Sequence, residues 1–205
     1  AMAKIFTDAA RVGASRVIEP IARGLLRLGV SPDAVTIAGT VGVVAAAIIF
    51  GARGQFVLAA LVVAVFALVD TLDGTMARLR GYSTRFGAFL DSTMDRVGDG
   101  AVFGAIAFWY VTAGEHPTVA AALICLVAAQ VISYVKARAQ SVGLPCEVGL
   151  VERAERLLVV GVGALVTGFG VGWALPVALW LLAVLSVATV VQRIVYVWRA
   201  DKESA

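Results

Sequence analysis

Long apolar segments, each able to cross a membrane, dominate this chain of 205 residues. A membrane-spanning helix needs about 20 mostly apolar residues to cross the hydrocarbon core of a bilayer. The chain is 60% apolar and its mean hydropathy is +0.93, whereas a soluble domain is only about 45–50% apolar. This composition argues against a soluble protein, and we expect an all-α integral membrane protein.

Six of these segments follow one another, separated by short polar or glycine-containing turns, and they predict six transmembrane helices. The expected helices cover residues 33–51, 56–78, 86–112, 118–139, 152–169 and 173–198. The first has a clear start signal, because Ser31 can cap the helix, Pro32 suits its first position and Asp33 places an acid in its first turn. We expect residues 31–205 to form one six-helix membrane domain.

The first 30 residues form a different kind of segment, in which basic residues alternate with apolar ones. The basic residues are Lys4, Arg11, Arg16, Arg23 and Arg27. Such a pattern is typical of a helix that lies in the membrane surface. The segment lacks the apolar core of a signal peptide, so we expect residues 1–30 to form an amphipathic surface helix.

The basic residues also predict how the helices are oriented. Sixteen of the seventeen Lys and Arg residues fall on one side of the predicted six-helix domain, and only Arg53 falls on the other. Because cytoplasmic loops carry an excess of Lys and Arg, we expect a multi-pass protein of the cell (inner) membrane. Both termini, and the amphipathic helix, should then lie on the cytosolic side.

Four aspartates gather where the second and third apolar segments meet. Asp70 and Asp73 are spaced i,i+3, and Asp91 and Asp95 are spaced i,i+4, so each pair shares one helical face. Ionisable residues beside apolar segments are costly and usually functional. Four neighbouring carboxylates repel one another unless a cation lies between them. Because the donors are all oxygen, Mg²⁺ or Mn²⁺ is favoured, and the pattern predicts a divalent-metal site on the cytosolic side.

Basic residues at the cytosolic ends of the last three predicted helices form a second candidate site. They include Lys136, Arg138, Arg156 and Arg193. In a compact bundle these side chains could converge on one anionic group. Alternatively, they only set the topology and reach out to lipid phosphates. We favour the first interpretation for Arg193, which lies among apolar residues, and the second for Arg199 and Lys202.

The run from Asp70 to Asp95 reads D-x2-D-G-x2-A-R-x8-G-x3-D-x3-D. In this the chain resembles the CDP-alcohol phosphotransferase family, and the resemblance extends over essentially its whole length. Members move a phosphatidyl-type group from a CDP-linked lipid to an alcohol and release CMP. The resemblance implies that Asp70, Asp73, Asp91 and Asp95 bind two Mg²⁺ or Mn²⁺ ions, that Asp95 is also the catalytic general base, and that the protein is a homodimer.

The resemblance also implies which residues bind the CDP-linked lipid. They are Asp33, Ala34, Val35, Thr36, Gly74, Ala77, Arg78 and Thr84. The stretch 32–36 is similar to a P-N-x-V-T pattern of the family, with Asp33 in place of the asparagine.

Residues 131–138 and 152–157 resemble the actinobacterial and archaeal branches of the family that use inositol phosphate as acceptor. The residues implied to hold the acceptor phosphate are Ser133, Lys136, Arg138, Arg156 and Arg193. Free inositol or choline would leave these charges unpaired. The expected reaction joins CDP-diacylglycerol and inositol phosphate to give phosphatidylinositol phosphate and CMP.

Three alternatives stay open. Two are enzymes of the same family, which would make phosphatidylglycerophosphate or archaetidylinositol phosphate. The third is a cation-coupled transporter, which would need charges near the bilayer centre on several helices.

Overall fold

The computed structural model describes residues 18–81 and 84–204, apart from the side chains of Asp70 and Ser204. Most of the expected amphipathic surface helix therefore lies outside the described residues, although residues 18–27 are helical. The described residues form helices and turns and no strand. The elements are α2 (Pro32–Ile49), the 3-10 helix η1 (Gly51–Arg53), α3 (Phe56–Arg80), α4 (Arg85–Thr112), α5 (His116–Ser141), α6 (Arg153–Gly168) and α7 (Ala174–Ser204).

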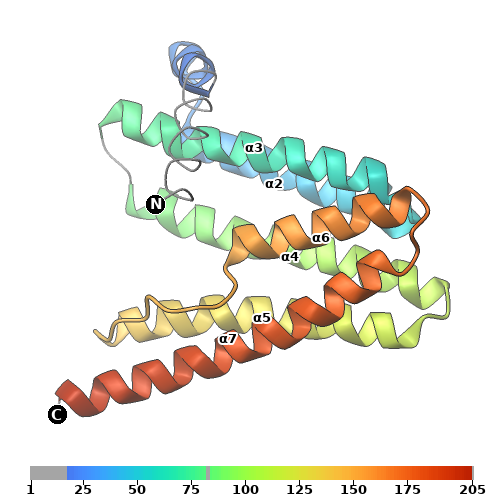
Figure 1. Cartoon of the computed structure of the whole chain (residues 1–205). Coiled ribbons are helices and arrows are strands. Elements are labelled where there is room, and N and C mark those ends of the chain that lie inside the picture. The colour runs from blue at the N-terminus through green and yellow to red at the C-terminus, as the bar shows by residue number, and fades with distance from the viewer. Residues whose placement is uncertain (1–17, 82–83, 205) are drawn as a thin grey trace, which may run out of the picture. The chain divides into compact units, whose positions relative to one another are not determined.

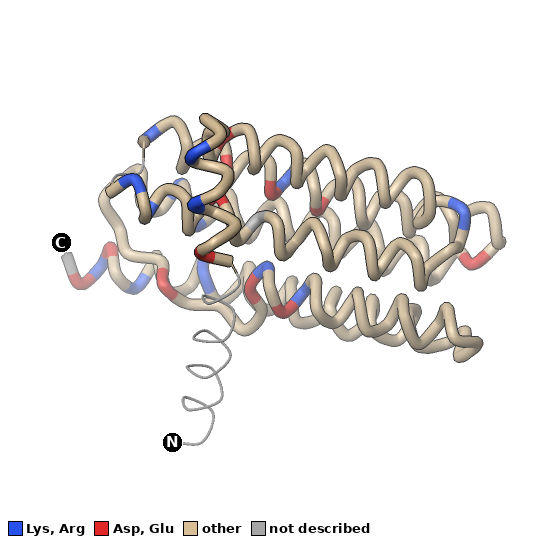
Figure 2. Tube along the Cα trace, turned by 90° about the horizontal axis from the view of Figure 1, so that it is seen from above, with Lys and Arg blue, Asp and Glu red and all other residues tan. Residues whose placement is uncertain are grey.

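Four stretches are long and apolar enough to cross a membrane. They are Pro32–Arg53, Phe56–Arg80, His116–Ser141 and Ala174–Glu203. In the last of them no charged residue precedes Arg193, and the charges gather at the C-terminal end of α7 (Figure 2). The other two expected spans differ, because α6 has only 16 residues and α4 carries several charged residues in its first half. The expectation of an all-α fold is thus confirmed for the described part of the chain, with four of the six expected spans matched by helices long and apolar enough to cross a membrane.

The chain divides into two compact units. The first contains Ala1–Val43 and Val62–Val97, and in it α2 runs beside α3 (Figure 1). Gly42 permits this close packing, because a Cβ atom there would lie 2.2 Å from the ring of Phe66. Near the cytosolic end expected from the sequence, Val35 and Met76 are buried against the helix formed by residues 18–27.

The second unit contains Val44–Leu61 and Gly98–Ala205. Here α7 lies alongside α5 and α6 (Figure 1), and Leu175, Leu179 and Leu182 of α7 are fully buried. The turn before α3 closes tightly, with Gly54 at a φ of +72° and a Cβ position only 2.5 Å from Trp109. Only glycine suits both conditions, so the turn between α2 and α3 depends on Gly54.

Candidate active site

The first turn of α2 begins as its sequence predicts. The Oγ atom of Ser31 accepts a hydrogen bond from the N–H of Ala34 at 3.2 Å, and proline at the first helical position leaves no N–H unpaired. Asp33 and Thr36 follow with a spacing of three residues and therefore lie on one face of α2. Both side chains line the same cavity.

Thr36 joins α2 to the aspartate motif on α3. Its hydroxyl donates a hydrogen bond to the carboxylate of Asp73, which is only 9% exposed. A buried carboxylate is costly unless it is hydrogen-bonded or paired with a cation. Asp73 is therefore held in one orientation by a residue 37 positions earlier in the chain.

A cavity of about 220 Å³ opens among α2, α3 and the start of α4 within the first unit. Seven of the site residues expected from the sequence line it, namely Asp33, Thr36, Asp73, Gly74, Ala77, Thr84 and Asp91. The structure thus brings together residues expected to bind the CDP-linked lipid and two of the expected metal ligands.

Two glycines shape this cavity in different ways. A Cβ atom on Gly74 would meet no other described atom within 4 Å, so this glycine leaves open space beside Asp73. Gly87 is instead tightly enclosed, because a Cβ atom there would lie 2.9 Å from Thr84 Oγ1 and 3.1 Å from Asp33 Oδ1. Gly87 also donates its N–H to Thr84 Oγ1 at 2.8 Å. The absence of a side chain at residue 87 therefore lets the start of α4 approach Asp33 closely.

The carboxylates at the cavity are suited to a hard divalent cation, because Asp73 and Asp91 both offer oxygen donors to the same space. Among the described side chains, no three acidic, histidine or cysteine groups meet closely enough to enclose an ion. The side chain of Asp70, the partner of Asp73 in the motif, lies outside that description. The expected set of four ligands therefore remains a prediction.

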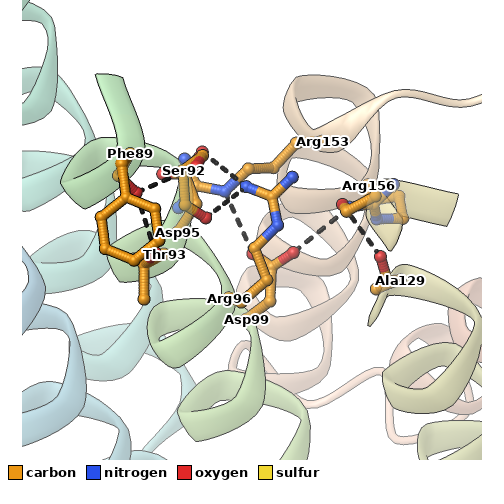
Figure 3. Close-up of polar contacts among 10 residues, drawn as sticks. Phe89, Ser92, Thr93, Asp95, Arg96, Asp99, Ala129, Arg153 and Arg156 are labelled. Atoms are coloured by element: carbon orange, nitrogen blue, oxygen red, sulfur yellow. Dashed lines mark hydrogen bonds and ion pairs between the residues drawn. The ribbon is translucent and has the colours of Figure 1, made fainter. Parts of the chain in front are cut away.

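Asp95 lies one helical turn after Asp91 on α4 and does not line the cavity. Its Oδ2 atom is 3.4 Å from Arg96 Nη1, and the same guanidinium nitrogen donates to the carbonyl of Ser92 at 2.7 Å (Figure 3). Arg96 therefore places a positive charge beside this partly buried carboxylate.

Three residues expected to bind the CDP-linked lipid lie away from the cavity lining. Val35 is buried in the core beside Met76, and Ala34 is exposed. Arg78 is also exposed and donates to Thr75 Oγ1 at 3.0 Å. Their assignment to the substrate remains a prediction.

The cavity also contains a cation that the sequence motif does not include. Arg80 lines it and donates from Nη2 to the carbonyl of Val30 at 3.4 Å. Its position two residues after Arg78, at the C-terminal end of the helix that carries the first two aspartates of the motif, was the available sequence signal.

The second unit contains a buried group of charges on α4 and α6. Asp99 is 4% exposed and Arg156 is 2% exposed. Asp99 Oδ2 accepts from Arg156 Nη2 at 3.2 Å, and Asp99 Oδ1 accepts from Arg153 Nε at 3.2 Å (Figure 3). The sequence reasoning missed Asp99, although it follows Asp95 by the same four residues that separate Asp95 from Asp91.

Arg193 is also buried, at 3% exposure, and it binds backbone rather than a single counter-ion. Its Nη1 donates to the carbonyl of Ile132 at 2.8 Å, and its Nε donates to that of Val148 at 2.7 Å. Glu152 lies at 3.5 Å from Nη2. These partners connect α5 to the segment before α6, and the assignment of Arg193 to the acceptor phosphate remains a prediction.

The three remaining residues expected at the acceptor phosphate lie at the end of α5. Lys136 pairs with Glu147 at 3.1 Å, and Arg138 is exposed and donates to Ser141 at 3.3 Å. Ser133 donates to the carbonyl of Ala129 at 3.1 Å. Both cations are accessible enough to exchange these contacts for those of an anionic ligand.

Replacing Gly87 with alanine tests the close approach of α4 to Asp33. We expect Gly87→Ala to raise the KM for the CDP-linked lipid about tenfold, because the added methyl group displaces Asp33 or Thr84. Thermal stability should change little, because alanine stabilises a helix by about 1 kcal/mol relative to glycine. This gain offsets part of the strain that the methyl group introduces. Steady-state kinetics and a thermal melt measure the two effects.

The matched control is Gly161→Ala in α6, where a Cβ atom meets nothing within 4 Å. It should leave the KM unchanged. An unchanged KM in Gly87→Ala as well would show that this contact does not shape the site.

The family model for CDP-alcohol phosphatidyltransferases matches residues 29–192. The chain belongs to the CDP-alcohol phosphatidyltransferase family, as its aspartate motif predicts.

Individual proteins from actinobacteria are also similar over most of the chain. A protein of Streptomyces avermitilis named phosphatidylinositol phosphate synthase is 48% identical over 203 residues, covering 95% of this chain and 83% of that protein. A protein of the same name from Mycobacterium marinum is 53% identical over 193 residues, covering 92% and 82%.

Two solved structures share the fold. The crystal structure of Mycobacterium tuberculosis phosphatidylinositol phosphate synthase with CDP-DAG bound is 52% identical, with a TM-score of 0.86 over 89% of this chain and 94% of that one. The same enzyme in complex with manganese and citrate is 52% identical, with a TM-score of 0.86 over 88% of each chain.

Proposed function

We propose that this protein transfers a phosphatidyl group from CDP-diacylglycerol to inositol phosphate, giving phosphatidylinositol phosphate and CMP. The observation that carries the proposal is the cavity of the first unit, where α2, α3 and α4 bring seven signature and helix-start residues together. The choice of acceptor rests on the actinobacterial relatives that carry this enzyme's name.

The CDP-diacylglycerol would occupy that cavity. Asp33, Thr36, Gly74, Ala77 and Thr84 line it, and we propose that they hold the nucleotide side of the substrate. Ala34, Val35 and Arg78 would complete this set. The space left by Gly74 suits the close approach of a ligand to the helix backbone.

Divalent ions would be held by Asp70, Asp73, Asp91 and Asp95, and we propose two ions, either Mg²⁺ or Mn²⁺. Manganese in the M. tuberculosis relative supports this assignment. When bound, such ions neutralise a diphosphate and stabilise the departing oxygen. Thr36 and the backbone N–H of Gly74 contribute by orienting Asp73, because each donates a hydrogen bond to one of its carboxylate oxygens.

The transfer itself is a substitution at phosphorus. A ring hydroxyl of inositol phosphate attacks the phosphorus on the lipid side of the diphosphate, the new P–O bond forms, and the bond to the CMP oxygen breaks. Asp95 accepts the hydroxyl proton, and the guanidinium of Arg96 lies 3.4 Å from its carboxylate.

The acceptor phosphate would be bound by Ser133, Lys136, Arg138, Arg156 and Arg193. A phosphate dianion can take several charge-assisted hydrogen bonds, and arginine forks are well suited to it. The buried guanidinium of Arg156 has an Nε that finds no partner among the described residues, which supports a ligand there.

We further propose the membrane arrangement that the sequence predicts. It has six spans, with α4 and α6 as the two beyond the four long apolar stretches, and an N-terminal surface helix. Both termini and the active site would be cytosolic at the inner membrane. The working form would be a homodimer.

The experiment that tests this function offers purified enzyme a panel of acceptors with CDP-diacylglycerol and measures CMP release and the lipid product by mass spectrometry. We expect the enzyme to accept inositol phosphate as a substrate and to reject glycerol phosphate, free inositol and choline. Turnover with glycerol phosphate alone would instead support the phosphatidylglycerophosphate alternative. Offering CDP-archaeol as a second donor tests the archaeal alternative, which turnover of that donor in place of CDP-diacylglycerol would support. Absence of CMP release with every pair of donor and acceptor would favour a transporter.

A further inference from the structure

The buried carboxylate of Asp99 lies outside the aspartate motif, yet it holds one of the arginines assigned to the acceptor phosphate. Its two oxygens accept one hydrogen bond each, from Arg156 and from Arg153, both at 3.2 Å (Figure 3). Side chains of Asp99 and Arg156 are both at least nine-tenths buried. The group therefore has two guanidiniums around a single carboxylate.

The way Asp99 binds Arg156 leaves part of that guanidinium unused. Arg156 contacts Asp99 through Nη2, while its buried Nε has no partner among the described residues. An unpaired buried donor lowers stability, and such groups in native proteins usually have a functional explanation. A bound anion would satisfy the donor.

The charges of the group lead to the same conclusion. A guanidinium buried without a counter-ion is strongly unfavourable, whereas a carboxylate beside it offsets much of that cost. Asp99 engages only the Nη2 end of Arg156, so the Nε–H on the other side of the guanidinium is left for an acceptor phosphate. Asp99 can thus stabilise Arg156 before the acceptor arrives without cancelling its attraction for an anion.

We propose that Asp99 is a positioning residue of the acceptor-phosphate site, which orients the guanidinium of Arg156 and keeps its Nε–H available to the phosphate. This inference rests on the proposed function, because it assigns Arg156 to the acceptor. Asp99 itself touches neither substrate. Its loss should weaken binding of inositol phosphate and leave CDP-diacylglycerol binding unaffected.

The test compares purified wild-type enzyme with Asp99→Asn, Arg156→Ala and the double variant. The rate of CMP release is measured as the inositol phosphate concentration is varied at saturating CDP-diacylglycerol. It is then measured as the CDP-diacylglycerol concentration is varied at saturating inositol phosphate. Asp99→Asn should raise the KM for inositol phosphate about tenfold, the effect of about 1.4 kcal/mol in one charge-assisted contact. We expect kcat to change by less than about threefold and the KM for CDP-diacylglycerol to stay unchanged.

The double variant separates positioning from a purely structural role. If Asp99 acts through Arg156, Asp99→Asn should add less than about a twofold rise to the KM of Arg156→Ala, because the two changes remove one interaction. Fully additive effects, or equal rises in both KM values, would overturn the proposal. Asp201→Asn, an exposed aspartate of α7, is the control.

Two outcomes distinguish this inference from the function on which it rests. If Arg156→Ala raises the acceptor KM but Asp99→Asn does not, only the role of Asp99 is overturned. If Arg156→Ala has no effect, the acceptor site is wrong as well. Should Asp99→Asn fail to fold, Asp99→Glu keeps the charge but moves the carboxylate, and an unchanged acceptor KM in that variant would equally overturn the proposal.

Discussion

Asp95→Asn is expected to abolish phosphatidyl transfer while the protein still folds and binds CDP-diacylglycerol. The amide keeps the size of the side chain and one oxygen donor, but it cannot take up the proton of the attacking hydroxyl. Losing a general base lowers the rate by about 10²–10⁴-fold, and we expect the upper part of that range because Asp95 is also assigned to a metal. CMP release measures the rate, and a thermal shift with CDP-diacylglycerol measures binding.

The exposed Asp201→Asn serves as the matched control and should be fully active. Asp91→Asn offers a second comparison, because Asp91 lines the cavity; that variant should lose part of its CDP-diacylglycerol binding. Full activity of Asp95→Asn would remove the base assignment, and loss of binding without loss of fold would make Asp95 a metal ligand only.

Arg156→Ala is expected to raise the KM for inositol phosphate by about 10- to 150-fold, since a contact between charged groups contributes roughly 1.5–3 kcal/mol. The variant also leaves Asp99 with Arg153 alone, and breaking a buried ion pair lowers stability by about 3–5 kcal/mol. Kinetics at saturating CDP-diacylglycerol and a thermal melt separate the two effects.

Arg156→Lys separates the effect on acceptor binding from the effect on protein stability. Lysine keeps a positive charge near Asp99 but lacks the guanidinium fork, so we expect a fold closer to wild type and still about a tenfold rise in KM. Arg199→Ala, at an exposed position of α7, should have no effect. An unchanged acceptor KM in both Arg156 variants would mean that these basic residues only set the membrane topology.

The helices and their limits were largely predictable from the sequence. Apolar segment length and turn residues placed the starts of α3 and α7 within one residue of those observed, and the cap of α2 at Ser31 is confirmed. These features depend on residues close together in the chain. Hydropathy was less informative for α4. Its length of 28 residues favours a membrane span, whereas the charged residues in its first half argue against one.

The cavity was predictable only in part, for a physical reason. Fixed spacing on two helices identified Asp73, Gly74 and Asp91 as neighbours of one site. The hydrogen bond from Thr36 to Asp73 could not be foreseen in the same way, because it joins residues 37 positions apart. Its formation depends on the packing of α2 against α3.

The charged groups of the second unit show the same limit. The apolar surroundings of Arg193 predicted a functional role for that residue, but the sequence could not show that backbone carbonyls hold it, nor that a carboxylate holds Arg156. Asp99 was overlooked because the family signature ends at Asp95. The pairing with Arg156 joins residues 57 positions apart and is visible only in the folded chain.

Divalent-metal dependence of CMP release tests the central claim most directly. The purified enzyme is stripped with excess chelator, supplied with CDP-diacylglycerol and inositol phosphate, and then given Mg²⁺ or Mn²⁺. We expect no CMP above background in chelator and full recovery with either ion, because Asp73 and Asp91 offer only oxygen donors at the cavity. Undiminished release in excess chelator would contradict the account.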